Sequence, residues 1–125
     1  MKKIISTENA PKAVGPYSQA VQYGDLLFCS GQLPIDPAVG KVVEGGIEAQ
    51  TRQAMENLKA VLAAAGMDFS NLIRTGIFLE DLNDFKVVNE IYGSYFKGDF
   101  PARATVQVAK LPLAVKVEIE AVAGR

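Results

Sequence analysis

The amino-acid sequence predicts an α+β domain of two layers, in which two helices cover one face of a mixed, mostly antiparallel sheet. Three observations lead to this prediction. Polar and apolar residues alternate strictly at 101–108 and at 115–121, as in strands with two different faces. A helical period starts at Ile47, and a second one starts after residue 81. Because two helices can cover only one face of such a sheet, the other face is expected to be partly polar and uncovered.

Short antiparallel strands are predicted near the N-terminus. Residues 19–23 and 26–29 are joined at Gly24 and Asp25, a dipeptide typical of a tight hairpin turn. A further short strand is predicted at residues 3–6. The segments rich in proline and glycine are predicted to be loops, the second of them with a brief extended piece at 41–43: residues 10–17 and residues 31–46.

Two helices and a strand fill the middle of the chain. Apolar side chains recur at helical spacing over residues 47–65, and Gly66 stands where a C-terminal cap is expected. Residues 72–79 are rich in β-branched and large apolar side chains, which favours a strand. The apolar positions of the second helix run as far as Phe96, so this helix is predicted to end near Gly98. Two residues could cap its N-terminus: Asp81 and Asn83.

The two alternating runs at the C-terminal end are predicted to pair as a hairpin. Their apolar side chains are then expected to share one face: Ala104, Val106, Val108, Val115, Val117, Ile119 and Ala121. The opposite face gathers their polar side chains: Arg103, Thr105, Gln107, Lys116, Glu118 and Glu120. A surface with a guanidinium, a hydroxyl and two carboxylates could hold a carboxylated small molecule and activate a water beside it. An ordinary solvated sheet face is the alternative.

Length and composition indicate a single domain spanning residues 1–125. The chain is 49% hydrophobic and 22% charged, which is typical of a globular protein. The net charge is −1 and no basic cluster occurs, so neither nucleic acid nor an anionic membrane surface is an expected partner. No apolar run approaches membrane-spanning length. The uncovered sheet face favours self-association into a homo-oligomer.

The sequence contains no histidine, and this absence excludes several kinds of site. Ser-His and Cys-His nucleophilic sites, histidine bases and nearly all zinc sites are removed, so no metal is expected. No phosphate-binding glycine motif of the Walker or GxGxxG type occurs. The single cysteine, Cys29, rules out an intramolecular disulfide and fits a reducing, cytoplasmic compartment. Because it lies in an apolar strand, it is interpreted as a small buried side chain and not as a nucleophile.

Charged residues of the C-terminal runs are the first candidates for chemistry. Arg103 could bind a carboxylate through its planar fork of donors, although a surface arginine that covers apolar neighbours is the alternative. Glu118 could orient or deprotonate a water if its surroundings bring its pKa toward the working range. The alternative for Glu118 and Glu120 is a plain polar strand face beside Lys116.

Four further residues could complete a small-molecule site. Ser30 and Gly31 directly follow an apolar strand, where glycine lets a ligand approach the backbone and serine adds a hydroxyl. Tyr17 lies in an apolar loop and could wall a pocket. Asn89 interrupts the apolar positions of the second helix. Each of them also has a plain structural interpretation, as a turn residue, a packed ring or an exposed helix position.

Taken together, these segments resemble one family. The matching segments run in order across nearly the whole chain: AVGPYSQ at 13–19, CSGQLP at 29–34, DLNDF at 81–85 with Val88 and Asn89, PAR at 101–103, VAKLP at 108–112 and VEIE at 117–120. On these motifs the chain resembles the Rid family, the reactive intermediate deaminases, also called YjgF-like proteins. No large insertion interrupts the match.

The resemblance implies a chorismate-mutase-like fold that assembles as a homotrimer, with a central barrel-like core and clefts between neighbouring subunits. It also implies hydrolysis of enamine and imine intermediates, such as 2-aminoacrylate, which pyridoxal-phosphate enzymes release. The products are a 2-oxo acid and ammonia, so the expected small-molecule partners are imino and 2-oxo acids. The family uses no cofactor and no metal.

The resemblance also assigns roles to residues. Arg103 matches the arginine that holds the substrate carboxylate, helped by the backbone N–H of Gly31. Glu118 matches the glutamate associated with the hydrolytic water. The remaining matches line the same cleft: Tyr17, Ser30 and Asn89. Two alternatives stay open, a non-catalytic sensor of small carboxylates that uses the same clefts and a trimeric partner-binding module with vestigial clefts.

Thr105 departs from the family pattern. Many members carry a cysteine at this position, two residues after the arginine. A threonine hydroxyl still forms hydrogen bonds but is a much poorer nucleophile than a thiolate, so catalysis through this side chain is not expected. Hydrolysis by a positioned water does not need the thiol. Substrate preference, by contrast, is expected to depend on the shape and polarity of Thr105.

Overall fold

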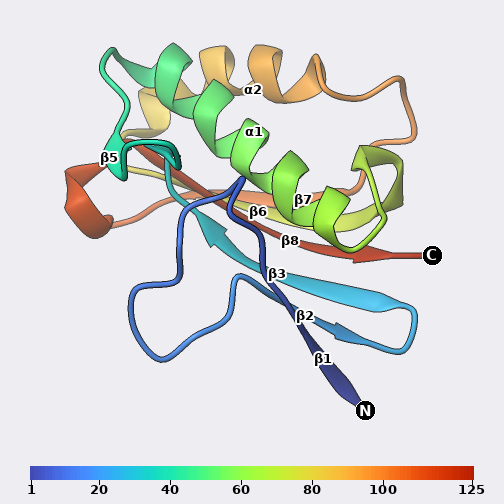
Figure 1. Ribbon diagram of the computed structural model, residues 1–125. Helices are drawn as coiled ribbons and strands as arrows, with labels where there is room; N and C mark the ends of the chain where they lie inside the picture. Colours follow the sequence, from blue (N-terminus) through green and yellow to red (C-terminus); the bar gives the residue numbers. More distant parts are fainter.

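The computed structural model describes residues 1–125 and contains two α-helices and eight strands (Figure 1). Their bounds are β1 Lys2–Ile5, β2 Ala20–Tyr23, β3 Leu26–Gln32, β4 Ile35–Asp36, β5 Lys41–Val42, α1 Ile47–Ala64, β6 Leu72–Leu79, α2 Phe85–Gly93, β7 Ala102–Gln107 and β8 Val117–Gly124. Six strands form one sheet in the order β1-β2-β3-β8-β6-β7, while β4 and β5 form a separate ribbon. All neighbours in the large sheet are antiparallel except β6 and β7. The predicted α+β class with a mixed, mostly antiparallel sheet is confirmed.

Local sequence signals account for most of these elements. β2 and β3 turn through Gly24, whose φ of 61° lies in the left-handed region that glycine adopts without strain. α1 ends just before Gly66, whose φ of 72° fits the predicted C-terminal cap. β6 covers the predicted residues, and β1 lies close to its predicted position. The β4–β5 ribbon contains the extended piece predicted in the second loop.

The second helix is shorter than predicted. A 3-10 turn at Leu82–Asp84 precedes α2, and the Asp81 carboxylate accepts a hydrogen bond from the Asn83 backbone N–H at 2.9 Å. α2 itself ends at Gly93, not near residue 98. The apolar spacing continues past that point because the rings of Tyr95 and Phe96 pack on Phe69, with centroid distances of 5.2 and 5.7 Å. Tyr95 and Phe96 are therefore apolar because they pack in the core after the helix has ended, and their spacing made the predicted helix too long.

The predicted C-terminal hairpin is wrong. β7 and β8 do not pair, because β6 lies between them and is parallel to β7 and antiparallel to β8. The segment between β7 and β8 contains a 3-10 turn at Pro112–Ala114, and it is long enough to step over a strand. Two-residue alternation predicts that a run is a strand but carries no information about its partner.

The predicted shared polar face is also wrong. Arg103 lies beside Thr75 across the β6–β7 pair, and Thr75 lies beside Ala121 across the β6–β8 pair, on the side that the helices cover. Glu120 lies beside Gly76 and points to the other side. Because residues paired across a ladder share a face, Arg103 and Thr105 lie on the covered face, whereas the glutamates of β8 lie on the open face.

The hydrophobic core lies between the helices and the covered face of the sheet. The largest fully buried side chains come from both layers: Leu27, Met55, Leu58, Val61, Leu62, Ile77, Leu79, Val117 and Ile119. Each such side chain contributes about 1.5–3 kcal/mol when removed from water. Two polar side chains of α1 fix neighbouring loops. The Asn57 amide donates to the carbonyls of Leu33 and Ile35 at 2.9 Å, and the Gln50 carbonyl accepts from the Lys116 N–H at 2.7 Å.

The open face of the sheet carries exposed apolar side chains. Ile4, Tyr23 and Phe28 are 53%, 61% and 47% exposed, and Val106 on the far edge strand is 45% exposed. Neither helix covers this face (Figure 1), so the uncovered face predicted from the sequence is confirmed and is more apolar than expected. Such a surface favours burial against a second protein surface. Neither helix is long and apolar enough to cross a membrane.

Candidate functional site

A cavity of about 660 Å³ opens beside the polar part of the open face. Five pieces of chain line it: the loop before β2, the end of β3, the segment from Leu33 to Ile35 that leads into β4, the turn at Pro112 and Leu113, and the first half of β8. Among the candidate residues it collects Tyr17, Ser30, Gly31, Glu118 and Glu120. We call these five residues the glutamate group. The predicted site residues of the N-terminal half therefore do meet the predicted glutamate.

A β-bulge shapes the floor of this cavity. Cys29 pairs with Ala121 and Gln32 pairs with Ile119, so Ser30 and Gly31 together lie opposite the single residue Glu120. A bulge leaves its extra residue outside the regular ladder and bends the strand. Both residues of this bulge, Ser30 and Gly31, line the cavity. The sequence showed the serine and the glycine but not the bulge.

Gly31 makes room for the Glu118 carboxyl group. A Cβ atom at residue 31 would collide with the carboxylate and lie only 2.8 and 3.0 Å from its Cδ and Cγ atoms. The second glutamate repeats the arrangement: a Cβ at Gly76 would lie 3.0 Å from a Glu120 carboxylate oxygen. Glycine at both positions lets the two carboxylates lie close to the backbone; a Cβ at residue 31 would displace Glu118, whereas one at residue 76 would require only a small shift of Glu120.

The pKa of Glu118 is raised above its usual value, first by burial and second by the neighbouring charge of Glu120. Glu120 has a partly compensating cation, since Arg74 lies 3.8 Å from its carboxylate. Glu118 has no such partner. A carboxylate that lies in a cavity with a raised pKa is suited to exchange protons with a bound water.

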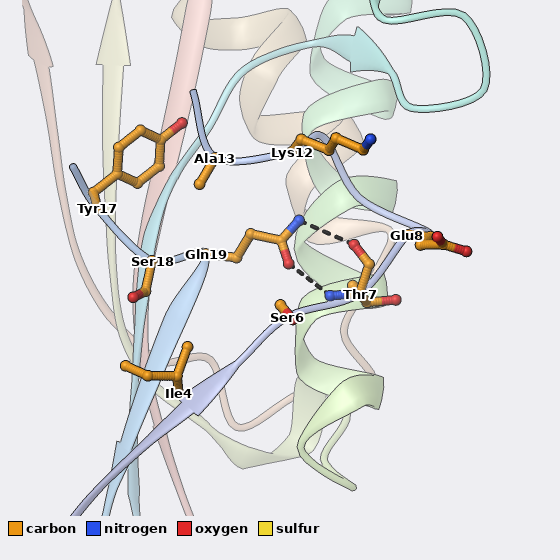
Figure 2. Close-up of a pocket in the computed structure, with 9 residues that line it drawn as sticks. All are labelled: Ile4, Ser6, Thr7, Glu8, Lys12, Ala13, Tyr17, Ser18 and Gln19. Carbon is orange, nitrogen blue, oxygen red and sulfur yellow. Dashed lines mark hydrogen bonds between the residues drawn. The ribbon is translucent and has the colours of Figure 1, made fainter. Parts of the chain in front are cut away.

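Side-chain hydrogen bonds fix the loop that carries Tyr17. The Gln19 amide accepts from the Thr7 N–H at 2.7 Å and donates to the Thr7 carbonyl at 3.1 Å, as Figure 2 shows. It also donates to the carbonyl of Pro11 at 2.7 Å. The Ser30 hydroxyl donates to the Ser18 carbonyl at 2.6 Å, which ties the loop to the bulge. Gln19 is a buried positioning residue that sequence reasoning missed, because nothing local marks its partners.

Tyr17 stands between two hollows. Its ring lines the main cavity and also a neighbouring hollow of about 520 Å³, drawn in Figure 2. The Tyr17 hydroxyl accepts from the Val14 N–H at 3.4 Å, and the side chain is half exposed. Tyr17 therefore forms part of a pocket wall, as predicted. Its side chain is more exposed than those of the hydrophobic core.

Arg103 lies elsewhere, on the edge strand β7 beneath α2. Its guanidinium carbon is 5.1 Å from the centre of the Tyr92 ring and 5.6 Å from the centre of the Phe85 ring. It forms no hydrogen bond or ion pair within the chain, whose only ion pair joins Arg74 and Glu120. All donors of the guanidinium thus remain available, and the side chain is exposed.

Asn89 and Thr105 accompany Arg103. Asn89 lies on α2 between Phe85 and Tyr92, one turn from each, and Thr105 follows Arg103 on the same face of β7. The Asn89 Oδ1 and Thr105 Oγ1 atoms are buried and have no hydrogen-bond partner in the chain. Buried polar atoms normally have one, so the hydrogen-bonding capacity of these two atoms is unsatisfied within the chain. We call Arg103, Thr105, Asn89, Phe85 and Tyr92 the arginine group.

The chain therefore holds the predicted site residues as two separate groups. Arg103 is two strands away from β8, about 10 Å along the sheet, and on the opposite face. No bending of a side chain brings it to Glu118. Phe85 and Tyr92 were not predicted to belong to the site, although two aromatic residues seven positions apart on a helix are a signal that they share a face.

Cys29 plays no part in either group. It is buried in β3, and burial raises the pKa of its thiol to about 12. The thiolate form needed for nucleophilic chemistry is therefore absent near neutral pH. This confirms the interpretation of Cys29 as a buried small side chain.

Comparisons with known proteins add the family context. Residues 7–124 match the family described as endoribonuclease L-PSP. Protein DfrA of Myxococcus xanthus is 59% identical over 98% of this chain and 95% of its own length, and a mouse 2-iminobutanoate/2-iminopropanoate deaminase is 52% identical over 98% of this chain and 91% of its own length. The crystal structure of E. coli TdcF with bound serine has 44% identity and a TM-score of 0.94, covering 98% of each chain. These matches confirm the family resemblance predicted from the motifs.

Proposed function

This chain belongs to the endoribonuclease L-PSP family, also called the YjgF/Rid family, and we propose that it hydrolyses reactive imine and enamine intermediates of the 2-aminoacrylate type to 2-oxo acids and ammonia. One observation carries the proposal: the Glu118 carboxylate lies on the Gly31 backbone in a cavity, with a raised pKa. Relatives named as imine deaminases support the reaction type.

We place the reaction at a cleft between two subunits of a homotrimer. The arginine group holds a cation without a counter-charge, and the glutamate group holds a carboxylate without an anchor for the substrate. Both groups lie in every chain but on opposite faces of its sheet. A second copy that presents its Arg103 to the cavity completes the site, and the exposed apolar side chains of the open face supply a surface for assembly.

The proposed chemistry needs binding, orientation and a proton shuttle. The enamine first tautomerises to the imine, whose C=N carbon is electrophilic. Arg103 of one subunit pairs with the substrate carboxylate, and the Gly31 N–H of the other assists. Glu118 takes a proton from water as the oxygen bonds to the imine carbon, and passes this proton to the nitrogen to give the carbinolamine. The hydroxyl proton of the carbinolamine then moves through Glu118 to the amino group, the C–N bond breaks as C=O forms, and ammonia and the 2-oxo acid leave with Glu118 ionised as at the start.

Charge favours a small carboxylate over a nucleic acid as the substrate. The chain carries a net charge of −1, and two glutamates line the cavity. A polyanion needs several phosphate contacts from lysine or arginine, whereas one guanidinium suffices for one carboxylate. The serine in the TdcF structure is likewise a small carboxylated molecule bound to a relative.

A binding protein for the same carboxylates is the second candidate. Thr105 favours it, because the hydroxyl replaces the thiol that the family pattern leads one to expect and its Oγ1 atom is unpaired. Arg103 and Gly31 suffice for binding, whereas turnover also needs Glu118. Loss of turnover with retained affinity in a Glu118→Gln variant separates the enzyme from the sensor.

The direct test is the release of pyruvate from freshly generated 2-aminoacrylate. A serine dehydratase supplies the intermediate, and wild type is compared with Arg103→Ala, with Arg52→Ala as a matched arginine control outside both groups, and with no protein. We expect wild type and Arg52→Ala to accelerate release, and Arg103→Ala to lose about 100-fold in kcat/KM, the cost of a charge-assisted bidentate contact. An unchanged rate in all samples, also with the threonine-derived analogue, would refute the deaminase.

A further inference from the structure

Arg103 stands where an arginine is normally mobile. It is exposed, lies on an edge strand and has no acidic partner. A long side chain in such a place samples many rotamers, and a ligand that fixes it must overcome the lost rotamer entropy. An anchor that is already held in place binds a carboxylate more tightly. The contacts around Arg103 show what holds it.

Arg103, Tyr92 and Thr75 form a closed set of contacts, and Phe85 adds a second ring beside the guanidinium. Arg103 packs against the Tyr92 ring at 5.1 Å, and the Tyr92 hydroxyl is hydrogen-bonded to the Thr75 hydroxyl at 2.7 Å. Thr75 is the residue beside Arg103 in the β6–β7 pair. The contacts therefore run from β7 to α2, to β6 and back to β7. Phe85 packs against the guanidinium at 5.6 Å, two helical turns before Tyr92.

Two members of this set are anchored in the core. Tyr92 is 3% exposed and Thr75 is fully buried, and their hydrogen bond gives each hydroxyl a partner there. The ring of Tyr92 is further fixed by Phe96, at a centroid distance of 4.9 Å. Arg103 thus packs against a buried and well-packed Tyr92 ring, although its own side chain is exposed.

Aromatic rings position an arginine without using its donors. A neighbouring carboxylate would also hold the guanidinium, but it would occupy the N–H groups that a substrate needs and would cancel the charge. Rings attract the cation through their π faces and leave the N–H groups free. Arg103 has rings and no carboxylate, which suits an anchor that must bind a ligand's carboxylate.

We propose that Phe85 and Tyr92 are positioning residues for the carboxylate-binding guanidinium of Arg103, with the Thr75 hydroxyl fixing the Tyr92 ring. The inference rests on the proposed role of Arg103 in binding a substrate carboxylate. Since that contact forms equally in the ground state and the transition state, loss of positioning raises KM and leaves kcat unchanged.

The first test replaces the exposed ring. Phe85→Leu keeps an apolar side chain at a surface position, and Phe100→Leu is the matched control because Phe100 packs on Phe96 and not on Arg103. We expect Phe85→Leu to raise KM for the imino acid by about 2- to 10-fold at constant kcat, the range of one cation–π contact. Phe100→Leu leaves KM unchanged.

Tyr92→Phe keeps the ring but removes the hydrogen bond to the Thr75 hydroxyl, and we expect a smaller rise in KM than for Phe85→Leu.

A second measurement reports position without turnover. The Arg103 Nε–H resonance, assigned by its absence in Arg103→Lys, should lie in the ring-current field of the two aromatic side chains. Phe85→Leu should shift and broaden this resonance, and Phe100→Leu should leave it in place. Titration with 2-oxobutanoate gives the affinity for the carboxylate independently of catalysis, and it should fall with the same fold-change as KM rises.

The outcomes separate this inference from the proposed function. If Arg103→Ala abolishes binding while Phe85→Leu binds 2-oxobutanoate like wild type, the positioning inference is overturned and the function stands. An equal Phe85→Leu penalty in the wild-type and Arg103→Lys backgrounds also overturns it, because the ring would then act without the guanidinium. If wild type neither binds 2-oxobutanoate nor releases pyruvate, the proposed function and this inference fail together.

Discussion

The two faces of the sheet carry functional groups of opposite charge, and each face holds its group by a different kind of contact. On the covered face, the arginine group holds a cation on aromatic rings and leaves its donors free. On the open face, the glutamate group holds a carboxylate against glycine and buries it enough to raise its pKa. The first arrangement suits an anchor, and the second suits a proton acceptor. Each group lacks what the other supplies.

Within a single chain, this separation keeps the two groups from neutralising each other. An arginine and a glutamate in direct contact would form an ion pair, which would lower the pKa of the carboxylate and occupy the guanidinium. Placed on opposite faces of one sheet, Arg103 has no carboxylate partner in the chain and the pKa of Glu118 stays raised. The comparison teaches that residues of one predicted site can lie apart in the folded chain, and the proposed assembly is what would join them.

The largest effect is expected for Glu118→Gln. Removing the proton acceptor should lower kcat by about 100- to 10,000-fold, while the affinity for 2-oxobutanoate changes little. Initial rates of pyruvate release and a binding titration measure the two quantities. Equal losses in kcat and affinity would mean that Glu118 binds the substrate and does not handle the water.

The same variant should be more stable than wild type at neutral pH. The folded-state pKa of Glu118 is raised, so the ionised carboxylate costs folding free energy once the pH exceeds that pKa, and glutamine removes the cost. Below the usual pKa of 4.5 both states are protonated, and the gain should vanish. Thermal unfolding at pH 7 and pH 4 checks the sign.

A smaller effect is expected for Gly31→Ala. The new methyl group cannot share the space of the Glu118 carboxylate, so the carboxylate must move away from the backbone. We expect a loss of about 10-fold or more in kcat from misplacement of the water. Gly93→Ala is the matched control, because a Cβ there meets nothing within 4 Å. Equal activity of both variants would show that contact with Gly31 does not place Glu118.

The smallest effect is a shift in pH dependence for Glu120→Gln. Glu120 raises the pKa of Glu118, so wild type should lose activity on acidification at a pH above 4.5. Without the charge of Glu120, the variant should lose its activity at a lower pH than wild type. Rates between pH 4 and pH 8 give both profiles. A shift to higher pH in the variant would contradict the assigned cause.

The element types were predictable from sequence because they depend on local signals. The hairpin at Gly24, the cap at Gly66 and the buried run of β6 each follow from a turn residue or an apolar period. Strand partners and faces were not predictable in the same way. The insertion of β6 between β7 and β8 depends on packing across the whole sheet, and it moved Arg103 to the face opposite Glu118.

The residues of the candidate site were predictable from the sequence, but their separation into two groups on opposite faces of the sheet was not. Motifs identified Arg103, Gly31 and Glu118, because the resemblance runs in order along nearly the whole chain. Physical reasoning from alternation alone joined Arg103 to Glu118 within one chain, and this was wrong. The spacing of Phe85 and Tyr92 indicates that they share one face of α2, but their contact with Arg103 depends on how α2 packs on β7, and no local pattern encodes that packing.

The most direct test of the central claim mixes two inactive variants. Arg103→Ala and Glu118→Gln chains are unfolded together in equal amounts, refolded and assayed for pyruvate release, with each variant refolded alone as the control. If every cleft takes Arg103 from one subunit and Glu118 from another, about one quarter of the clefts in a random mixture contain both intact groups, and activity should recover to that level. Mixtures that stay as inactive as the separate variants, in refolded and assembled protein, would contradict a site shared between subunits.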